Sequence, residues 1–180
     1  DFKELTNIMF ASSSLLDRLE TTGRLSTEIA RGLGVVGVAA RASGIALDTR
    51  IIHPYAAYNE VDFDVPVFHY EGDVLARVRV RIDEIYQSIY IIEQCFEKMA
   101  DGPIKVPIKE IPPYKQALSY VESPRGENIY WIMTAPNNML FRYKVRSPSF
   151  CNWPAIPYTT PGNIVPDFPL INKSFELCYS

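Results

Sequence analysis

The sequence predicts an α+β fold in which long helices form a bundle beside a small antiparallel sheet and proline-rich irregular loops. Two observations support this prediction. Residues 73–99 keep an unbroken helical repeat of apolar side chains. All 14 prolines except Pro54 and Pro66 lie between residues 103 and 169, where long helices are therefore excluded. We expect one fragment over residues 1–180, mainly helical over 1–101 and built from a small sheet and an extended segment over 102–180.

The first helix is expected over residues 3–20, because Leu5, Ile8, Leu15 and Leu19 recur at helical spacing. Gly23 would end this helix, and Ser26 would cap a short second helix. Small residues follow, and we expect close backbone packing or a turn at Gly32, Gly34 and Gly37.

The strongest periodicity belongs to the long helix of residues 73–99. Its apolar positions alternate between spacings of three and four residues and form what we call the apolar seam: Leu75, Val78, Ile82, Ile85, Ile89, Ile92, Phe96 and Met99. The opposite side carries charged residues: Arg77, Arg81, Glu84, Glu93 and Glu97. Such a helix is roughly 40 Å long and needs partners along its length. We expect it to join the 3–20 helix in an antiparallel bundle.

Three strands are expected after residue 102, at about 117–122, 128–134 and 140–146. The motif "APNNM" between the last two has the composition of a hairpin turn. The remaining proline-rich chain is expected to be extended.

Composition excludes several functional classes. The net charge is −3 and like charges do not cluster, so a nucleic-acid partner is not expected. No apolar run reaches the roughly 18 residues of a membrane span, and no signal peptide is recognisable. Because the sequence opens within a helical pattern and without Met, we expect a fragment. Cys95, Cys151 and Cys178 are far apart, which favours a reducing compartment and completes no metal site.

Candidate chemistry gathers at a few polar motifs. In "ESPRGE", Pro124 and Gly126 place Arg125 on a rigid corner between two carboxylates, where it could reach into a cavity or form a surface ion pair. The local pattern favours the ion pair. Three further features are expected to be structural: a network of Arg41, Asp48 and Arg50, the single histidines His53 and His69, and an anchor formed by Asp62 and Asp64. Cys178 by itself is typical of a buried small hydrophobe.

Six motifs occur in order along the chain: "GVAARASGIALDTR", "PYAAYNEVDFDVPV", "EGDVLARVRVRIDEIYQSIYII", "VESPRGENIYWIMT", "FRYKVRSPSF" and "NIVPDFPLINKSFELC". Together they resemble the C-terminal half of the large, catalytic subunit of energy-converting [NiFe] hydrogenases. The same superfamily includes the 49-kDa or D subunit of complex I, the NADH-quinone oxidoreductase. The resemblance covers nearly all of the chain and implies a partial fold of the hydrogenase large-subunit type.

The resemblance implies roles for three residues. Cys178 matches the first cysteine of a C-terminal CxxC whose thiolates hold the nickel–iron centre, and Glu176 matches the acid two residues before it. The second cysteine would be residue 181. Arg125 matches the arginine that projects over the open metal site. Cys178 is thus the expected metal ligand, and Arg125 and Glu176 are the expected catalytic residues, with Arg125 also contacting the cofactor.

The implied function is H₂ oxidation or proton reduction at a [NiFe] centre, coupled to electron transfer through an iron–sulfur cluster in a small partner subunit. Two alternatives remain: a complex I-type quinone-binding subunit, and a non-catalytic coupling or assembly homologue without metal. The resemblance places the complex on the inner, cytoplasmic face of the cell membrane through membrane subunits. It also implies a missing N-terminal half whose helices cover the apolar seam. The isolated fragment is expected to be inactive, to bind no nickel and to self-associate.

Overall fold

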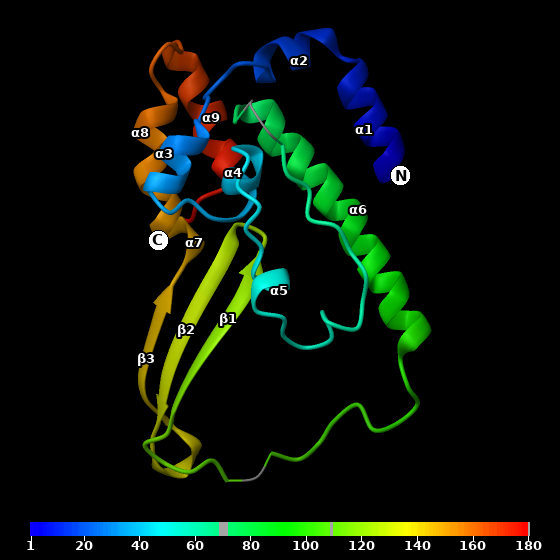
Figure 1. Ribbon diagram of the computed structural model, residues 1–180, viewed down its shortest axis with the longest axis vertical. Helices are drawn as coiled ribbons and strands as arrows, with labels where there is room; N and C mark the ends of the chain where they lie inside the picture. The colour runs from blue at the N-terminus through cyan, green and yellow to red at the C-terminus, as the bar shows by residue number, and fades with distance from the viewer. Residues whose placement is uncertain (69–71, 109, 180) are drawn as a thin grey trace.

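The computed structural model describes residues 1–68, 72–108 and 110–179. Helices gather at one end of the molecule, the sheet extends away from them, and one long helix runs beside both (Figure 1). The elements in chain order are α1 (Phe2–Ala11), α2 (Ser13–Leu19), α3 (Thr27–Gly32), α4 (Gly37–Ala42), α5 (Thr49–Ile52), α6 (Val74–Lys98), β1 (Gln116–Ser123), β2 (Gly126–Thr134), η1 (Pro136–Asn138), β3 (Leu140–Arg146), α7 (Pro148–Asn152), η2 (Trp153–Ala155), α8 (Ile156–Thr159), η3 (Val165–Asp167) and α9 (Phe168–Phe175). The α+β prediction is confirmed. Within the described residues, no helix combines the length and apolarity needed to cross a membrane.

The sheet has the expected strands with slightly longer ends. Its order is β1-β2-β3, with both pairs antiparallel. Ser123 pairs with Gly126 at the turn between β1 and β2, so this turn is tight. The "APNNM" turn is also confirmed, and Asn137 adopts the left-handed conformation that such turns favour.

The expected helix over residues 3–20 is divided in two. Ser12 has an extended conformation, with φ −86° and ψ 98°, between α1 and α2. Three consecutive serines occupy this point, and their hydroxyls compete with helical backbone hydrogen bonds. The second expected helix is present as α3, and the Ser26 hydroxyl caps it by accepting from the Ile29 N–H.

The long helix α6 forms as expected but packs mainly on other partners. Asp73 caps its first turn and also accepts the Thr21 N–H at 2.8 Å. The helix lies chiefly against α4 and α9, whereas α1 reaches it where Phe2 and Thr6 contact Tyr86. The expected antiparallel pairing of the 3–20 region with this helix is thus present (Figure 1), but α4 and α9 supply more of the packing.

The segment after β3 is helical, which corrects the expectation of an extended chain. The short helices α7, α8 and α9 and the turns η2 and η3 all carry proline at their first or second position. Proline at these positions removes no helical hydrogen bond, and its fixed φ suits the first turn. The prolines therefore start short helices here.

The core lies between the N-terminal part of α6, α4 and α9. Leu75, Ala40, Ile171 and Phe175 belong to one cluster of buried side chains. Arg77, on the charged side of α6, is 0% exposed within this region. The charged side of the helix thus faces the protein along its first turns.

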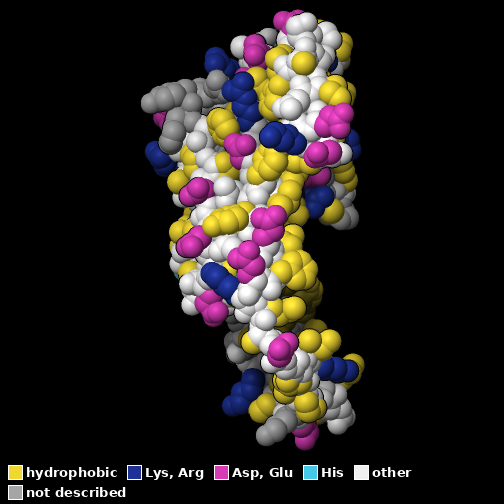
Figure 2. Space-filling view, turned by 90° about the vertical axis from the view of Figure 1, so that its right-hand side faces the viewer, with side chains coloured by type: hydrophobic (Ala, Val, Ile, Leu, Met, Phe, Trp, Pro, Cys, Tyr) yellow, Lys and Arg dark blue, Asp and Glu magenta, His cyan; other side chains and the backbone are white. Residues whose placement is uncertain are grey.

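The apolar seam is buried only at its N-terminal end. Leu75 is 2% exposed, whereas Phe96 is 70% exposed and Met99 is 69% exposed. The intermediate seam residues Ile85, Ile89 and Ile92 are also exposed. The space-filling view of this side of the molecule shows hydrophobic patches between acidic and basic side chains (Figure 2). The second half of the seam is therefore an uncovered apolar face.

Candidate functional site

The turn that carries Arg125 rests directly on the N-terminus of α4. A Cβ atom on Gly37 would lie 2.2 Å from the Arg125 carbonyl oxygen, and one on Gly126 would lie 2.7 Å from the Gly37 nitrogen. Both glycines also have positive φ angles, +67° and +125°. Only residues without a side chain permit this contact, so the predicted close packing near Gly37 is confirmed. The contact fixes the backbone of the corner from which Arg125 projects.

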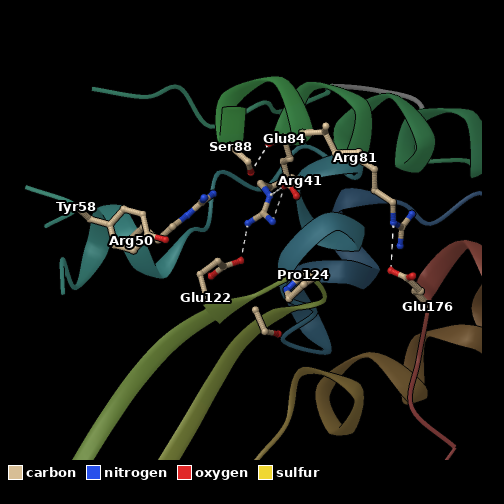
Figure 3. Close-up of a pocket in the computed structure, with 11 residues that line it drawn as sticks. Arg41, Arg50, Tyr58, Arg81, Glu84, Ser88, Glu122, Pro124 and Glu176 are labelled. Atoms are coloured by element: carbon tan, nitrogen blue, oxygen red, sulfur yellow. Dashed lines mark hydrogen bonds and ion pairs between the residues drawn. The ribbon is translucent and has the colours of Figure 1, made fainter. Parts of the chain in front are cut away.

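Glu176, the residue directly after α9, contacts Arg125 on this corner. Its backbone is left-handed, with φ 58°, and its carbonyl oxygen accepts a hydrogen bond from Arg125 Nε. Its carboxylate lies 3.6 Å from Nε of Arg81 on α6 (Figure 3). The chain therefore brings Arg125 and Glu176 together from positions 51 residues apart.

Cys178 lies two residues further on and is held through its backbone. Its N–H donates to Ser149 Oγ at 3.0 Å, and its carbonyl accepts from Trp153 Nε1 at 3.0 Å. The residue is exposed, which corrects the local expectation of a buried hydrophobe. Residues 1–68, 72–108 and 110–179 contain no group of three potential metal ligands. Cys178 lies two residues after Glu176, whose carbonyl Arg125 contacts, and a thiolate is the donor type that nickel and iron take.

The expected network of Arg41, Asp48 and Arg50 is present. Arg41 is 1% exposed, and its guanidinium lies 3.4 Å from Asp48. Arg50 binds the same carboxylate through two nitrogens, at 2.9 and 2.6 Å. Asp48 also caps α5 by accepting the Arg50 N–H, so the network anchors this loop.

The network extends further than the sequence indicated. Arg41 binds Glu84 of α6 at 2.7 Å and Glu122 of β1 at 3.0 Å. Glu122 in turn accepts the Thr49 N–H at 3.0 Å. One buried guanidinium thereby ties α4, α6 and the end of β1 together, directly before the Arg125 corner.

A cavity of about 480 Å³ separates this network from Glu176. Arg41 of α4, Arg81 and Glu84 of α6, Glu122 of β1 and Glu176 after α9 point toward it (Figure 3). The full lining also contains Arg50, Tyr58, Ile85, Ser88, Ser123 and Pro124. The cavity combines cationic and anionic groups with few apolar ones.

Burial changes the acidity of two groups in this lining. It raises the pKa of the Glu84 carboxyl, although Arg41 opposes the shift. It lowers the pKa of Arg81, and the carboxylates of Glu176 and Glu84 oppose that shift. Among the described residues, Arg81 Nη2 is buried and has no hydrogen-bond partner. The cavity therefore has a buried carboxyl, Glu84, whose proton is held more tightly than in water, with cationic groups of Arg41 and Arg81 in the same lining.

Among the residues that the structure describes, neither glutamate of "ESPRGE" pairs with Arg125, contrary to what the local pattern favoured. Glu122 binds Arg41, and Glu127 binds Arg146 of β3. Arg125 itself lies in the turn between β1 and β2, outside both strands. Arg125 is left to contact Glu176.

The other candidates lie outside this site. His53 is exposed and stacks on Tyr120 with ring centroids 4.9 Å apart. The segment of Asp62 and Asp64 is anchored by backbone N–H groups that donate to Gln94 and Gln87 of α6. The segment is therefore held through these backbone hydrogen bonds, and the expected salt bridge of the two carboxylates stays a prediction. His69 lies outside the described residues.

Sequence reasoning missed the residues that hold Cys178. Ser149 and Trp153 lie 29 and 25 residues before it. Only the run "SPSF" in one of the six motifs indicated that this segment matters. Arg81 and Glu84 occupy charged positions on α6, but nothing in the helical repeat showed that they face a cavity.

Comparison with known proteins supports the family resemblance. The family model of the respiratory-chain NADH dehydrogenase 49 Kd subunit matches residues 1–116 and 106–180. Formate hydrogenlyase subunit 5 of Escherichia coli (strain K12) is 37% identical over 100% of this chain. The D subunit of the NADH-quinone oxidoreductase of Desulfotalea psychrophila is 40% identical over 91%, and the carbon monoxide-induced hydrogenase of Rhodospirillum rubrum is 37% identical over 98%. The resemblance drawn from the motifs is confirmed.

The chain spans only part of the length of these relatives. It covers 32% of the formate hydrogenlyase subunit, 44% of the quinone oxidoreductase subunit and 49% of the carbon monoxide-induced hydrogenase. The contacts described above therefore correspond only to the part of each relative that this chain covers.

Proposed function

The chain belongs to the family of the respiratory-chain NADH dehydrogenase 49 Kd subunit, and from this premise we propose that it is part of the large subunit of an energy-converting [NiFe] hydrogenase. The observation that carries the proposal is the meeting of Arg125, Glu176 and the segment of Cys178 at one corner. Relatives of both the hydrogenase and the quinone oxidoreductase kind match the chain. An exposed cysteine two residues after the carbonyl that binds Arg125 favours the hydrogenase.

Each of the three residues has a proposed task. The Cys178 thiolate is one ligand of a nickel–iron centre, since soft thiolates suit these metals. The bound centre supplies the Lewis acid for heterolytic splitting of H₂. Arg125 is fixed by its bond to the Glu176 carbonyl and orients a donor toward the open side of the site. The Glu176 carboxylate takes a proton from the site and passes it toward the cavity.

The partners and location belong to the same proposal. Electrons pass to an iron–sulfur cluster in a small partner subunit, and membrane subunits hold the complex on the inner, cytoplasmic face of the cell membrane. The relatives support an assembly, because their names describe them as subunits of formate hydrogenlyase and of NADH-quinone oxidoreductase.

The test uses the complete subunit in its native complex. We expect stoichiometric nickel in the wild-type complex, loss of nickel and of H₂ evolution in Cys178→Ser, and neither loss in Cys95→Ser, which removes an exposed thiol from α6. Glu176→Gln should keep nickel but lower turnover on the order of 10²-fold or more, as for loss of a proton-transfer group. A nickel-free active complex, or a Cys178→Ser variant that retains nickel, contradicts the proposal.

The second candidate is a quinone-binding subunit of the complex I type. It is favoured by the 40% identity to the D subunit of an NADH-quinone oxidoreductase. In that case the cavity of about 480 Å³ beside Arg81 and Glu176 would take a quinone headgroup. Quinone reduction by a nickel-free complex decides for this candidate. A complex with neither nickel nor quinone reduction would be the non-catalytic homologue.

A further inference from the structure

The segment of α7 and η2 holds both halves of the candidate site. At one end, Trp153 donates its indole N–H to the Cys178 carbonyl, and Ser149 accepts the Cys178 N–H. Both backbone groups of Cys178 are thus bound by one short segment. A residue held on both sides keeps its Cα–Cβ direction, which limits the thiol to the few positions that the staggered side-chain rotamers allow.

The adjacent residue Asn152 binds the opposite half. It is 1% exposed, its Oδ1 accepts the Val36 N–H at 2.9 Å, and its Nδ2 donates to the Val36 carbonyl at 3.1 Å. Val36 immediately precedes Gly37, which contacts the Arg125 carbonyl. Asn152 therefore fixes the surface on which the Arg125 corner rests.

We propose that Asn152 and Trp153 are positioning residues that set the separation of Arg125 and Cys178. The inference rests on the proposed function, in which these two side chains face one metal centre. Asn152 and Trp153 are consecutive, and prolines at 148 and 154 restrict the backbone on both sides of them. A change at either residue is therefore transmitted to one half of the site while the other half stays bound.

Such a device suits chemistry between a guanidinium and a metal ligand. Small errors in the position of reacting groups reduce turnover strongly, and rigid supporting residues limit those errors. Asn152 and Val36 are both buried, so water competes weakly for the two hydrogen bonds between them. Cys178 is exposed, and its position depends on being bound on both sides by Ser149 and Trp153.

The first test is hydrogen exchange on the complete complex. Trp153→Phe removes the indole N–H and keeps an aromatic ring, so amide exchange over residues 176–179 should accelerate on the order of tenfold while residues 35–37 stay unchanged. Asn152→Ala should instead accelerate amide exchange at residues 35–37 and in the Arg125 corner, and leave residues 176–179 unchanged. Trp131→Phe, in β2, is the matched control and should alter neither segment.

The second test is the electron paramagnetic resonance spectrum of nickel in the same complexes. Trp153→Phe should retain nickel but shift or broaden its signal, and Trp131→Phe should reproduce the wild-type spectrum. Unchanged amide exchange at residues 176–179 in Trp153→Phe would show that Trp153 does not hold the Cys178 segment, and this result overturns the proposal. Accelerated exchange with an unchanged nickel spectrum also overturns the positioning role, because the contact would then be structural only.

The two tests separate this inference from the proposed function. A wild-type complex without nickel refutes the function and with it the positioning of a metal ligand. The exchange pattern then still shows whether Trp153 and Asn152 bind the two segments. If Asn152→Ala fails to fold, Trp153→Phe and its control decide the result.

Discussion

Arg77 is a buried charge whose hydrogen bonds are all supplied by neighbouring protein groups. It donates to the Gly72 and Gly23 carbonyls and to Ser174 Oγ at 2.8 to 2.9 Å, and its guanidinium lies 4.5 Å from the centre of the Phe175 ring. Burial lowers the pKa of Arg77 to about 9, so the group remains charged at pH 7. Arg77 joins the first turn of α6 to the loop before α3 and to α9.

Replacing Arg77 with lysine should destabilise the protein. A lysine ammonium keeps the charge but cannot reach three acceptors in the directions of the guanidinium. Buried carbonyl groups would lose their partners, and we expect the free energy of unfolding to fall by about 3 kcal/mol. Urea denaturation measures this loss. Arg142→Lys at an exposed position of β3 is the control, and an equal effect in both variants would contradict the role of Arg77.

Glu84 provides a pH-dependent prediction. Because burial raises the pKa of its carboxyl, the folded chain holds this proton to higher pH than the unfolded chain does. The folded state binds more protons in that window, so the contribution of Glu84 to stability falls as pH rises above about 4.3. The stability advantage of the wild type over Glu84→Gln should therefore shrink between about pH 4.5 and pH 7 in urea titrations. An advantage that grows with pH would show that the ion pair with Arg41 outweighs burial.

At the scale of elements, the contact between α4 and the turn from β1 to β2 positions the site. The backbones meet without side chains, because Gly37 faces Arg125 and Gly126 faces Gly37. Arg41, one turn further along α4, reaches Glu122 at the end of β1. The helix therefore supports the corner through both packing and charge.

Gly37→Ala tests this contact against a matched control. Gly34 and Gly37 have the same φ of +67°, but a Cβ on Gly34 meets nothing within 4 Å whereas one on Gly37 meets the Arg125 carbonyl. The control variant is Gly34→Ala. Both alanines lose the conformational freedom of glycine, but only the one in Gly37→Ala also clashes with backbone atoms. We expect Gly37→Ala to be the less stable variant by about 1–3 kcal/mol in chemical denaturation. Equal stabilities would mean that the corner moves away at no cost.

The elements show which signals a sequence carries. The strands and α6 follow from local periodicity, which depends on neighbours within a few residues, and their bounds were nearly correct. The helices after Pro148 were missed because proline both interrupts helix interiors and begins helices, and composition does not separate the two. The division at Ser12 has a local cause in three serines, but the strong apolar repeat concealed it.

The candidate site was predictable only in part. Local patterns favoured an ion pair for Arg125, and only the family resemblance joined Arg125 to Glu176 and Cys178. The structure adds the contacts of Asn152 and Trp153, which bind partners 116 and 25 residues away. Such contacts depend on the assembled fold, and neither residue carries a charge or motif that marks it beforehand.

At the scale of the whole molecule, one side of the chain carries an apolar surface that no other part of the described chain covers. The second half of the seam is open from Ile85 to Met99, and Ile104, Val106 and Ile108 in the following segment are exposed as well. Large apolar patches on a protein surface mark sites of association. The chain also spans less than half of the relatives described above.

We therefore expect the isolated chain to self-associate in solution through α6. Ile92→Lys places a charge in the uncovered seam and should shift the mass measured by light scattering toward the monomer, because a buried lysine at the contact would lose its hydration. Glu93→Lys is the matched control: it introduces the same side chain one position away, outside the seam, and also at an exposed residue. The control should associate like the wild type, since the apolar face is unchanged. A monomeric wild-type chain at micromolar concentration, or equal effects of the two lysines, would show that the seam drives no association.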